Sequence, residues 1–153
     1  MSNPVLQIGP RLVGSNWEPL IIAELGINHG GSLSCAKHMV DLAARSGCEC
    51  IKHQTHFVND EMTEEAKDIV PAHAHDSIWS IIERCALSKD AEIELKHHAE
   101  SLGLIYISTP FSRAAADFLA EIDVPAFKIG SGECDNVALV NHIASQIIHG
   151  YRH

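Results

Sequence analysis

The sequence predicts an α/β protein built on a parallel sheet, and three observations point to that class. Short apolar runs rich in β-branched residues alternate along the chain with segments whose apolar residues recur at helical spacing. The chain has 153 residues, which corresponds to one domain at about 150 residues per domain. Hydrophobic residues make up 46% and charged residues 20%, a balance that excludes a largely disordered or collagen-like chain.

Residues 1–18 are predicted to form a small hairpin that caps the domain. Two short apolar stretches, Val5–Ile8 and residues 11–13, flank the turn-forming pair Gly9-Pro10. Because each stretch is brief and is followed by glycine or proline, we expect this hairpin to lie outside the main sheet.

The first strand and helix of the main sheet follow directly. Residues 20–23 form a continuous apolar run, which is typical of a strand buried on both faces. Ser32 and Ser34 are candidate N-caps for a helix with an apolar stripe, and Gly47 stands where a C-terminal glycine is expected. This segment is therefore one βα unit.

The same pattern recurs three more times. Further strands are predicted at residues 48–56, 104–109 and 126–130, and further helices near 77–85, 91–102, 113–122 and 137–145. Right-handed βαβ connections would place such strands side by side in chain order. A doubly wound sheet would be complete with this number of strands, whereas a (β/α)₈ barrel of about 250 residues would be half built. Residues 26–31 lack the G-x-G-x-x-G pattern of a dinucleotide loop, but the pattern of elements alone leaves both architectures open.

Charge and composition argue against several kinds of binding partner and cellular location. Lys and Arg number 11 against 20 Asp and Glu, and the net charge of −9 argues against nucleic acid and against an anionic membrane surface. No apolar run approaches the roughly 18 residues of a membrane span, and the N-terminus lacks the features of a signal peptide, so we expect a cytoplasmic protein. The five cysteines form no C-x-x-C pair, and this predicts neither a zinc ribbon nor a disulfide framework.

Charged residues stand inside or directly after the predicted strands. Glu24 lies on the first, Lys52 and Gln54 share one face of the second, and Lys128 lies on the fourth. A charge buried in a strand is costly unless it is paired or used. Since ligands of parallel α/β folds bind at the carboxyl ends of strands, these residues predict a functional site there.

The residue types in this candidate site suit a small anionic substrate. Two lysines on neighbouring strands would hold a carboxylate or a phosphate, and the carboxylates of Glu24 and Glu133 would orient hydroxyl groups or move protons. The sequence around Ser131, with a glycine on either side, allows backbone N–H groups to approach an anion closely.

Four strand-end segments give the sequence a specific resemblance. In order along the chain they are residues 21–29, 51–56, 107–112 and 127–133. Together they resemble the successive strand-end motifs of the sialic acid synthase family, most of all N-acetylneuraminate synthases. The resemblance implies a partial (β/α)₈ TIM barrel of about four βα units, with residues 19–146 as its N-terminal half behind the hairpin of residues 1–18.

The resemblance also implies an activity and a set of roles. It implies the condensation of phosphoenolpyruvate with N-acetylmannosamine and the release of phosphate. Phosphoenolpyruvate would be bound by Lys52, Thr109, Lys128 and Ser131. Gln54 and Glu133 would face the sugar and the metal-bound water, with Glu24 organising the same site. The alternatives are a legionaminate or other nonulosonate synthase fragment, and a non-catalytic half-barrel that binds anions or self-associates.

A divalent metal, Mn²⁺ or Mg²⁺, is expected for the full-length family, whose histidine ligands lie in later βα units. No metal ligand is therefore predicted within these residues. The sequence departs from the family near Gln146, so we expect a truncated or frame-disrupted product with a divergent tail at residues 147–153. Such a chain is expected to be catalytically silent on its own, and to form a homodimer or to aggregate through its open sheet edges.

Overall fold

The computed structural model describes residues 4–150 as an α/β fold with two sheets. Strands β1 (Val5–Ile8) and β2 (Arg11–Gly14) pair in antiparallel fashion, as predicted for the hairpin. The main sheet contains β3 (Ile22–Gly26), β4 (Cys50–Thr55) and β5 (Ile105–Pro110). These three strands are parallel and lie side by side in chain order, which confirms that part of the prediction.

The helices occupy the predicted segments with small differences at their ends. Their bounds are α1 Leu33–Arg45, α2 Val58–Glu61, α3 Ile78–Cys85, α4 Lys89–Ser101, α5 Arg113–Glu121 and α6 Val137–Gly150, with 3₁₀ turns η1 at Glu64–Lys67 and η2 at Ser131–Glu133. Four helices begin at a serine whose hydroxyl oxygen accepts a hydrogen bond from a backbone N–H in the first turn: Ser32, Ser77, Ser88 and Ser112. These caps satisfy backbone donors that would otherwise lack partners, and they fix where each helix starts.

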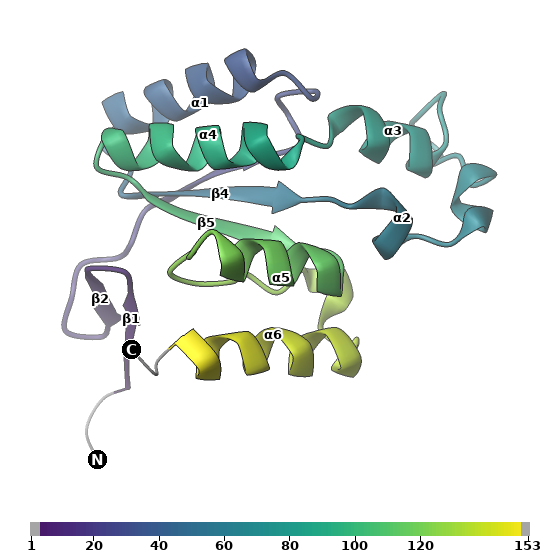
Figure 1. The fold of residues 1–153 in the computed structure, drawn as a ribbon. Helices are drawn as coiled ribbons and strands as arrows, with labels where there is room; N and C mark the ends of the chain where they lie inside the picture. The colour runs from purple at the N-terminus through teal and green to yellow at the C-terminus, as the bar shows by residue number, and fades with distance from the viewer. Residues whose placement is uncertain (1–3, 151–153) are drawn as a thin grey trace.

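The helices cover one face of the sheet, here called the outer face. Figure 1 shows α1 and α4 side by side along the strands, and α5 and α6 as a second adjacent pair. The main core lies between this face and the helices, where Leu25 and Ile51 of the strands pack near Val40 of α1 and Leu95 of α4. The opposite face, here called the inner face, is the one that a closed barrel would enclose.

The hairpin lies at the amino end of the main sheet, away from the arrowheads of β4 and β5 (Figure 1). Ile8 of β1 packs with Cys50 and Ile107 in a small second core. Arg11 Nε, 2.8 Å from Glu49 Oε2, joins the hairpin to the start of β4. The hairpin thus closes the amino end of the inner face and leaves the carboxyl end for a site.

The fourth predicted strand does not form as a strand. Within residues 126–130 only Phe127 makes a parallel bridge, to Ser108, and the Lys128 N–H donates to the Ser108 carbonyl oxygen at 3.0 Å. A strand needs consecutive ladder hydrogen bonds, and among the described residues this segment has no neighbour on its far side. The half-barrel count of four βα units is therefore not confirmed, although the segment lies next to β5 as expected.

Three further expectations concern the tail, the helices and the cysteines. Helix α6 continues to Gly150, so the predicted tail of residues 147–153 begins inside it, and residues 151–153 lie outside the described part. Within the described range no helix is long and apolar enough to cross a bilayer. All five cysteines are free, and Cys35 and Cys134 are exposed.

Candidate functional site

Glu24 and Lys52 meet on the inner face. The register of β3 and β4 places them as direct neighbours, and the Lys52 ammonium forms an ion pair with the Glu24 carboxylate. The Lys52 side chain is only 14% exposed, whereas that of Glu24 is 47% exposed. The lysine charge is therefore held in place by a carboxylate that itself borders solvent.

Gln54 lies close to the Glu24–Lys52 pair, beside Gly26. Gly26 has a φ of +54°, and a Cβ there would lie 3.5 Å from Glu24 Oε1 and 3.9 Å from Gln54 Nε2. The left-handed backbone favours glycine, and the turn brings the carboxylate and the amide to the same spot. Gln54 Oε1 also lies 3.2 Å from His56 Nε2, while His56 Nδ1 lies 2.9 Å from Glu61 Oε1. His56 and Glu61 thus hold Gln54, a support that sequence reasoning did not assign.

Thr109 and Glu133 converge on Gly130. In the register of β4 and β5, Thr109 is the neighbour of Gln54 and so faces the same side. A Cβ on Gly130 would lie 3.6 Å from Thr109 Cγ2 and 3.4 Å from Glu133 Cγ. Thr109 is 1% exposed, and its Oγ1 has no hydrogen-bond partner among the described residues. A buried hydroxyl without a partner is costly, and a bound polar group would satisfy it.

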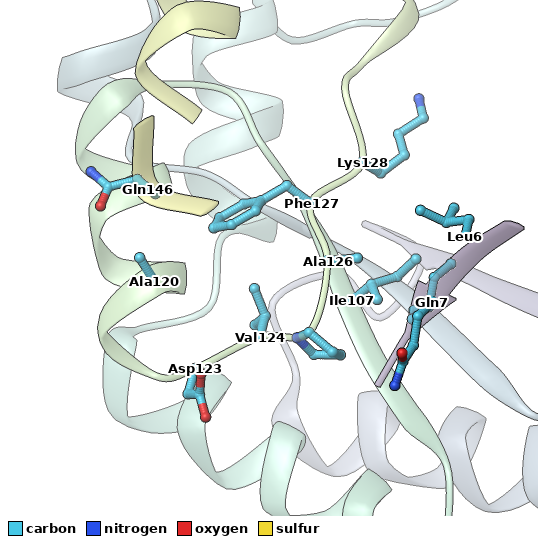
Figure 2. A pocket seen from close by; sticks show the side chains of 12 residues that line it. Leu6, Gln7, Ile107, Ala120, Asp123, Val124, Ala126, Phe127, Lys128 and Gln146 are labelled. Carbon is cyan, nitrogen blue, oxygen red and sulfur yellow. The ribbon is translucent and has the colours of Figure 1, made fainter. Parts of the chain in front are cut away.

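Lys128 lies one residue beyond the bridge at Phe127, so it shares the inner side with Thr109. Figure 2 shows the side chains of Phe127 and Lys128 leaving the chain in opposite directions. Lys128 is half-buried, and it makes no ion pair with any side chain that the structure describes. It borders a hollow of about 490 Å³ between the hairpin, β5 and residues 123–128.

The structure does not bring every predicted residue into one pocket. Lys128 lines the larger hollow, which lies beside the hairpin, whereas Lys52 pairs with Glu24 and does not line that hollow. Glu133 lines a second hollow of about 230 Å³ together with His56 and Phe111. Ser131 is exposed in η2, and its side chain contacts none of the other predicted site residues within the described range.

The loop that follows β3 contains a buried histidine. His29 is 3% exposed, and burial lowers its pKa from 6.5 to about 4, with the nearby ring of His53 acting in the same direction. Burial disfavours the charged imidazolium, so His29 is neutral at pH 7. The sequence motif contains this residue, but nothing in the sequence assigned it a partner.

Among the described residues, no group of three or more His, Cys, Asp or Glu side chains is arranged to hold a metal ion. The acidic and amide groups around Gly26 and Gly130 do not supply such a cluster.

The comparison with protein families decides the relationship. The model of the NeuB family matches residues 39–148, which is most of the chain. The chain belongs to the NeuB family. The match reaches into the first residues of the segment that was predicted to diverge after Gln146.

Relatives of this NeuB-family chain include named synthases. It is 37% identical over 145 residues to the N,N'-diacetyllegionaminic acid synthase of Legionella pneumophila, covering 91% of this chain and 40% of that protein. It is 31% identical over 139 residues to the human N-acetylneuraminate-9-phosphate synthase, covering 89% of this chain and 39% of that protein. The chain thus spans about two fifths of the length of these relatives.

A solved structure supports the same relationship. The N-acetylneuraminic acid synthetase of Leptospira borgpetersenii, crystallised with citrate, superposes with a TM-score of 0.82 at 26% identity. The superposition covers 94% of this chain and 47% of that one. The fold is therefore similar to that part of a sialic acid synthase.

Proposed function

We propose that this chain forms the phosphoenolpyruvate-binding part of an N-acetylneuraminate-type synthase. In the proposed reaction phosphoenolpyruvate condenses with the open-chain aldehyde of N-acetylmannosamine, and cleavage of a C–O bond releases phosphate. The product is a nine-carbon 2-keto sugar acid. Membership in the NeuB family and the named synthases among the relatives support this reaction class.

The proposal rests most on the buried hydroxyl of Thr109. Its Oγ1 has no partner among the described residues, and Thr109 and Lys128 each follow the Ser108–Phe127 bridge by one residue, so they share the inner face. A phosphate or carboxylate oxygen would accept a hydrogen bond from Thr109 and a charge-assisted one from Lys128. The second lysine, Lys52, would face the same anion in an orientation fixed by Glu24. Ser131 would add a hydroxyl from the exposed turn η2.

Gln54 and Glu133 are proposed to serve the sugar. Gln54 is held by His56, so its free amide nitrogen keeps a defined direction toward Gly26 and Glu24. Glu133 borders the hollow that Phe111 and His56 also line, and its carboxylate would accept hydrogen bonds from sugar hydroxyls. In a full-length family member the expected Mn²⁺ or Mg²⁺ would polarise the sugar aldehyde, and the resemblance places its histidine ligands in later βα units.

A legionaminate-type synthase is the second candidate. The observation that favours it is the 37% identity to the Legionella enzyme, compared with 31% to the human one. A third candidate is a non-catalytic half-barrel that binds anions weakly, or that pairs as a homodimer through the open edge at residues 126–130. Assays of phosphate release with Mn²⁺ and either N-acetylmannosamine or a diacetylated hexosamine separate the two sugars.

Direct binding of phosphoenolpyruvate to the 153-residue chain tests the proposal. Calorimetric titration is expected to give a measurable Kd, and Lys128→Ala is expected to raise it about thirtyfold, or about 2 kcal/mol, by removing a charge-assisted contact. The matched control is Lys37→Ala on α1, because Lys37 pairs with Glu94 away from the site. An unchanged Kd in Lys128→Ala would contradict the role of Lys128, and the absence of binding by the unsubstituted chain would contradict the proposed function.

A further inference from the structure

Behind the candidate site, the outer face carries a buried polar cluster. Glu92 of α4 is 1% exposed and lies over β4 and β5. Its Oε1 accepts hydrogen bonds from the Thr55 hydroxyl at 2.5 Å and from the Tyr106 hydroxyl at 3.0 Å. The Thr55 and Ser108 hydroxyls are 2.7 Å apart. Burial, followed by the nearby Glu92 carboxylate, raises the pKa of Tyr106 well above 10, so Tyr106 keeps its proton.

Two histidines extend this cluster to the loop after β3. His29 Nε2 lies 3.0 Å from His53 Nε2, and His53 Nδ1 lies 3.4 Å from Glu92 Oε1. The last separation is long for a hydrogen bond, and His53 Nδ1 has no closer partner among the described atoms. The His53–Glu92 contact is therefore the weakest interaction in this cluster.

The hydrogen bonds require one tautomer for each ring. The backbone N–H of Gly31 donates to His29 Nδ1 at 3.1 Å, so this nitrogen carries no proton. The neutral ring of His29 then carries its proton on Nε2 and donates it to His53 Nε2. His53 must in turn carry its own proton on Nδ1, which points to the carboxylate of Glu92.

The loop at the end of this series borders the candidate site. Asn28 precedes His29, and its Nδ2 donates to the Leu25 carbonyl oxygen at 2.9 Å. A Cβ on Gly26 would lie 3.6 Å from Asn28 Nδ2 and 3.5 Å from Glu24 Oε1. At Gly31 the φ is +81°, and a Cβ would lie 2.2 Å from the Arg84 carbonyl oxygen, so the loop is wedged against the end of α3. One side of the loop thus faces Glu24 while the other ends in the buried His29.

We propose that His29, His53 and Glu92 are positioning residues for the loop of residues 26–31, which includes Asn28 and borders Glu24. They act through a relay of single tautomers that consists of two hydrogen bonds, Gly31–His29 and His29–His53, and the longer contact between His53 and Glu92. The relay runs from the Gly31 amide through both rings to the carboxylate on α4. It uses no group that touches the substrate. What the loop is positioned for rests on the proposed function, but the relay itself does not.

Nitrogen-15 NMR of the histidine-labelled chain at pH 7.5 tests the relay directly. Long-range ¹H–¹⁵N spectra separate protonated from unprotonated ring nitrogens. The unsubstituted chain is expected to show the proton of His29 on Nε2 and that of His53 on Nδ1. A proton on Nδ1 of His29, or on Nε2 of His53, would overturn the proposal, and this measurement needs no variant to fold.

Two substitutions of His53 sharpen the test. His53→Phe keeps a ring but removes the acceptor, so His29 should show both tautomers and the Gly31 amide should exchange with solvent about tenfold faster. His53→Gln places an amide oxygen near the position of Nε2 and should restore the single tautomer of His29 and the slow exchange at Gly31. Equal behaviour of the two variants would count against the relay.

Phosphoenolpyruvate binding, measured on the same samples, separates the two proposals. Loss of binding only in His53→Phe supports the positioning role. The expected tautomers in a chain that never binds phosphoenolpyruvate would leave the relay standing and remove the proposed function.

Discussion

The inner and outer faces of the same strands carry polar residues of opposite character. On β4, the outward residues His53 and Thr55 are buried and bonded within the protein, whereas the inward Lys52 and Gln54 lie toward the open side. On β5 the same contrast between bonded and unbonded polar groups separates two adjacent residues, Ser108 and Thr109. Ser108 joins the outer cluster, while the hydroxyl of Thr109 has no partner among the described residues.

This contrast separates two uses of buried polarity. Most of the outer groups satisfy one another, with His53 Nδ1 the exception among the described atoms, so they contribute to stability and to the precise position of the loop after β3. The inner groups retain unused hydrogen-bonding capacity at Thr109 and an unpaired ammonium at Lys128 among the described side chains. The alternation of side chains along the strands therefore separates polar groups that bond within the protein from groups, such as the Thr109 hydroxyl, without a partner among the described residues.

Of the changes considered, removal of Glu92, the shared hydrogen-bond acceptor on the outer face, should lower the free energy of unfolding most. Glu92→Ala leaves the hydroxyls of Thr55 and Tyr106 and the ring of His53 without their acceptor, and it should lower the free energy of unfolding by about 4 kcal/mol. Urea unfolding followed by circular dichroism measures this change. The control is Glu94→Ala, because Glu94 is exposed and pairs with Lys37; a similar loss in both variants would contradict the buried role of Glu92.

Acid should weaken the outer face before the rest of the fold. Burial, followed by the neighbouring ring of His53, lowers the pKa of His29 from 6.5 to about 4, against the opposing effects of the Gly26 backbone and of Glu92. The unfolded chain binds this proton more readily, so stability is complete above pH 6.5 and falls as the pH drops toward 4, by about 3 kcal/mol in total.

Unfolding free energies measured between pH 8 and pH 4.5 check this dependence. His29→Gln removes the titrating ring and should flatten the curve in that window. The exposed His38→Gln should keep the slope of the unsubstituted chain. A curve that is level for the unsubstituted chain would show that His29 titrates normally.

Two buried threonines give the most direct comparison of the faces. Thr55→Val removes a hydroxyl bonded to Glu92 and Ser108 and should cost about 2 kcal/mol of stability. Thr109→Val removes a hydroxyl that has no partner in the described part of the chain, and it should change stability by less than about 0.5 kcal/mol. The same Thr109→Val change should weaken phosphoenolpyruvate binding several-fold, so a stable Thr109→Val chain with unaltered binding would remove Thr109 from the proposed site.

The sequence predicted the architecture better than the internal partners. The alternation along residues 51–56 correctly placed Lys52 and Gln54 on one face and His53 on the other. The sequence also predicted a strand at residues 126–130, but a local pattern does not reveal whether a second neighbouring strand exists to complete a ladder. Its reduction to a single bridge at Phe127 could not be read from local pattern.

The outer cluster was missed because Glu92 stands on a helix with many charged residues. A signal was present, since Glu92 shares the buried stripe of α4 with Leu95 and Ala99 at helical spacing. A carboxylate on such a stripe needs buried donors, and the strands beneath supply them. The distance from Glu92 to the Thr55 hydroxyl depends on how α4 crosses the sheet, which sequence spacing does not determine. The ion pair between Lys52 and Glu24 depends on the β3–β4 register in the same way.

The hairpin that closes the amino end of the inner face has a consequence for the order of folding during synthesis. Its strands pair over a few residues of chain, so β1 and β2 can zip together within microseconds of leaving the ribosome. The contact of Ile8 with Ile107 joins residues far apart in the sequence and can form only after β5 has emerged. At about 5–20 residues per second, the hairpin therefore waits for several seconds with Ile8 exposed to solvent. Its exposed Leu6 and Leu12 make that interval the time when a chaperone would find the nascent chain most readily.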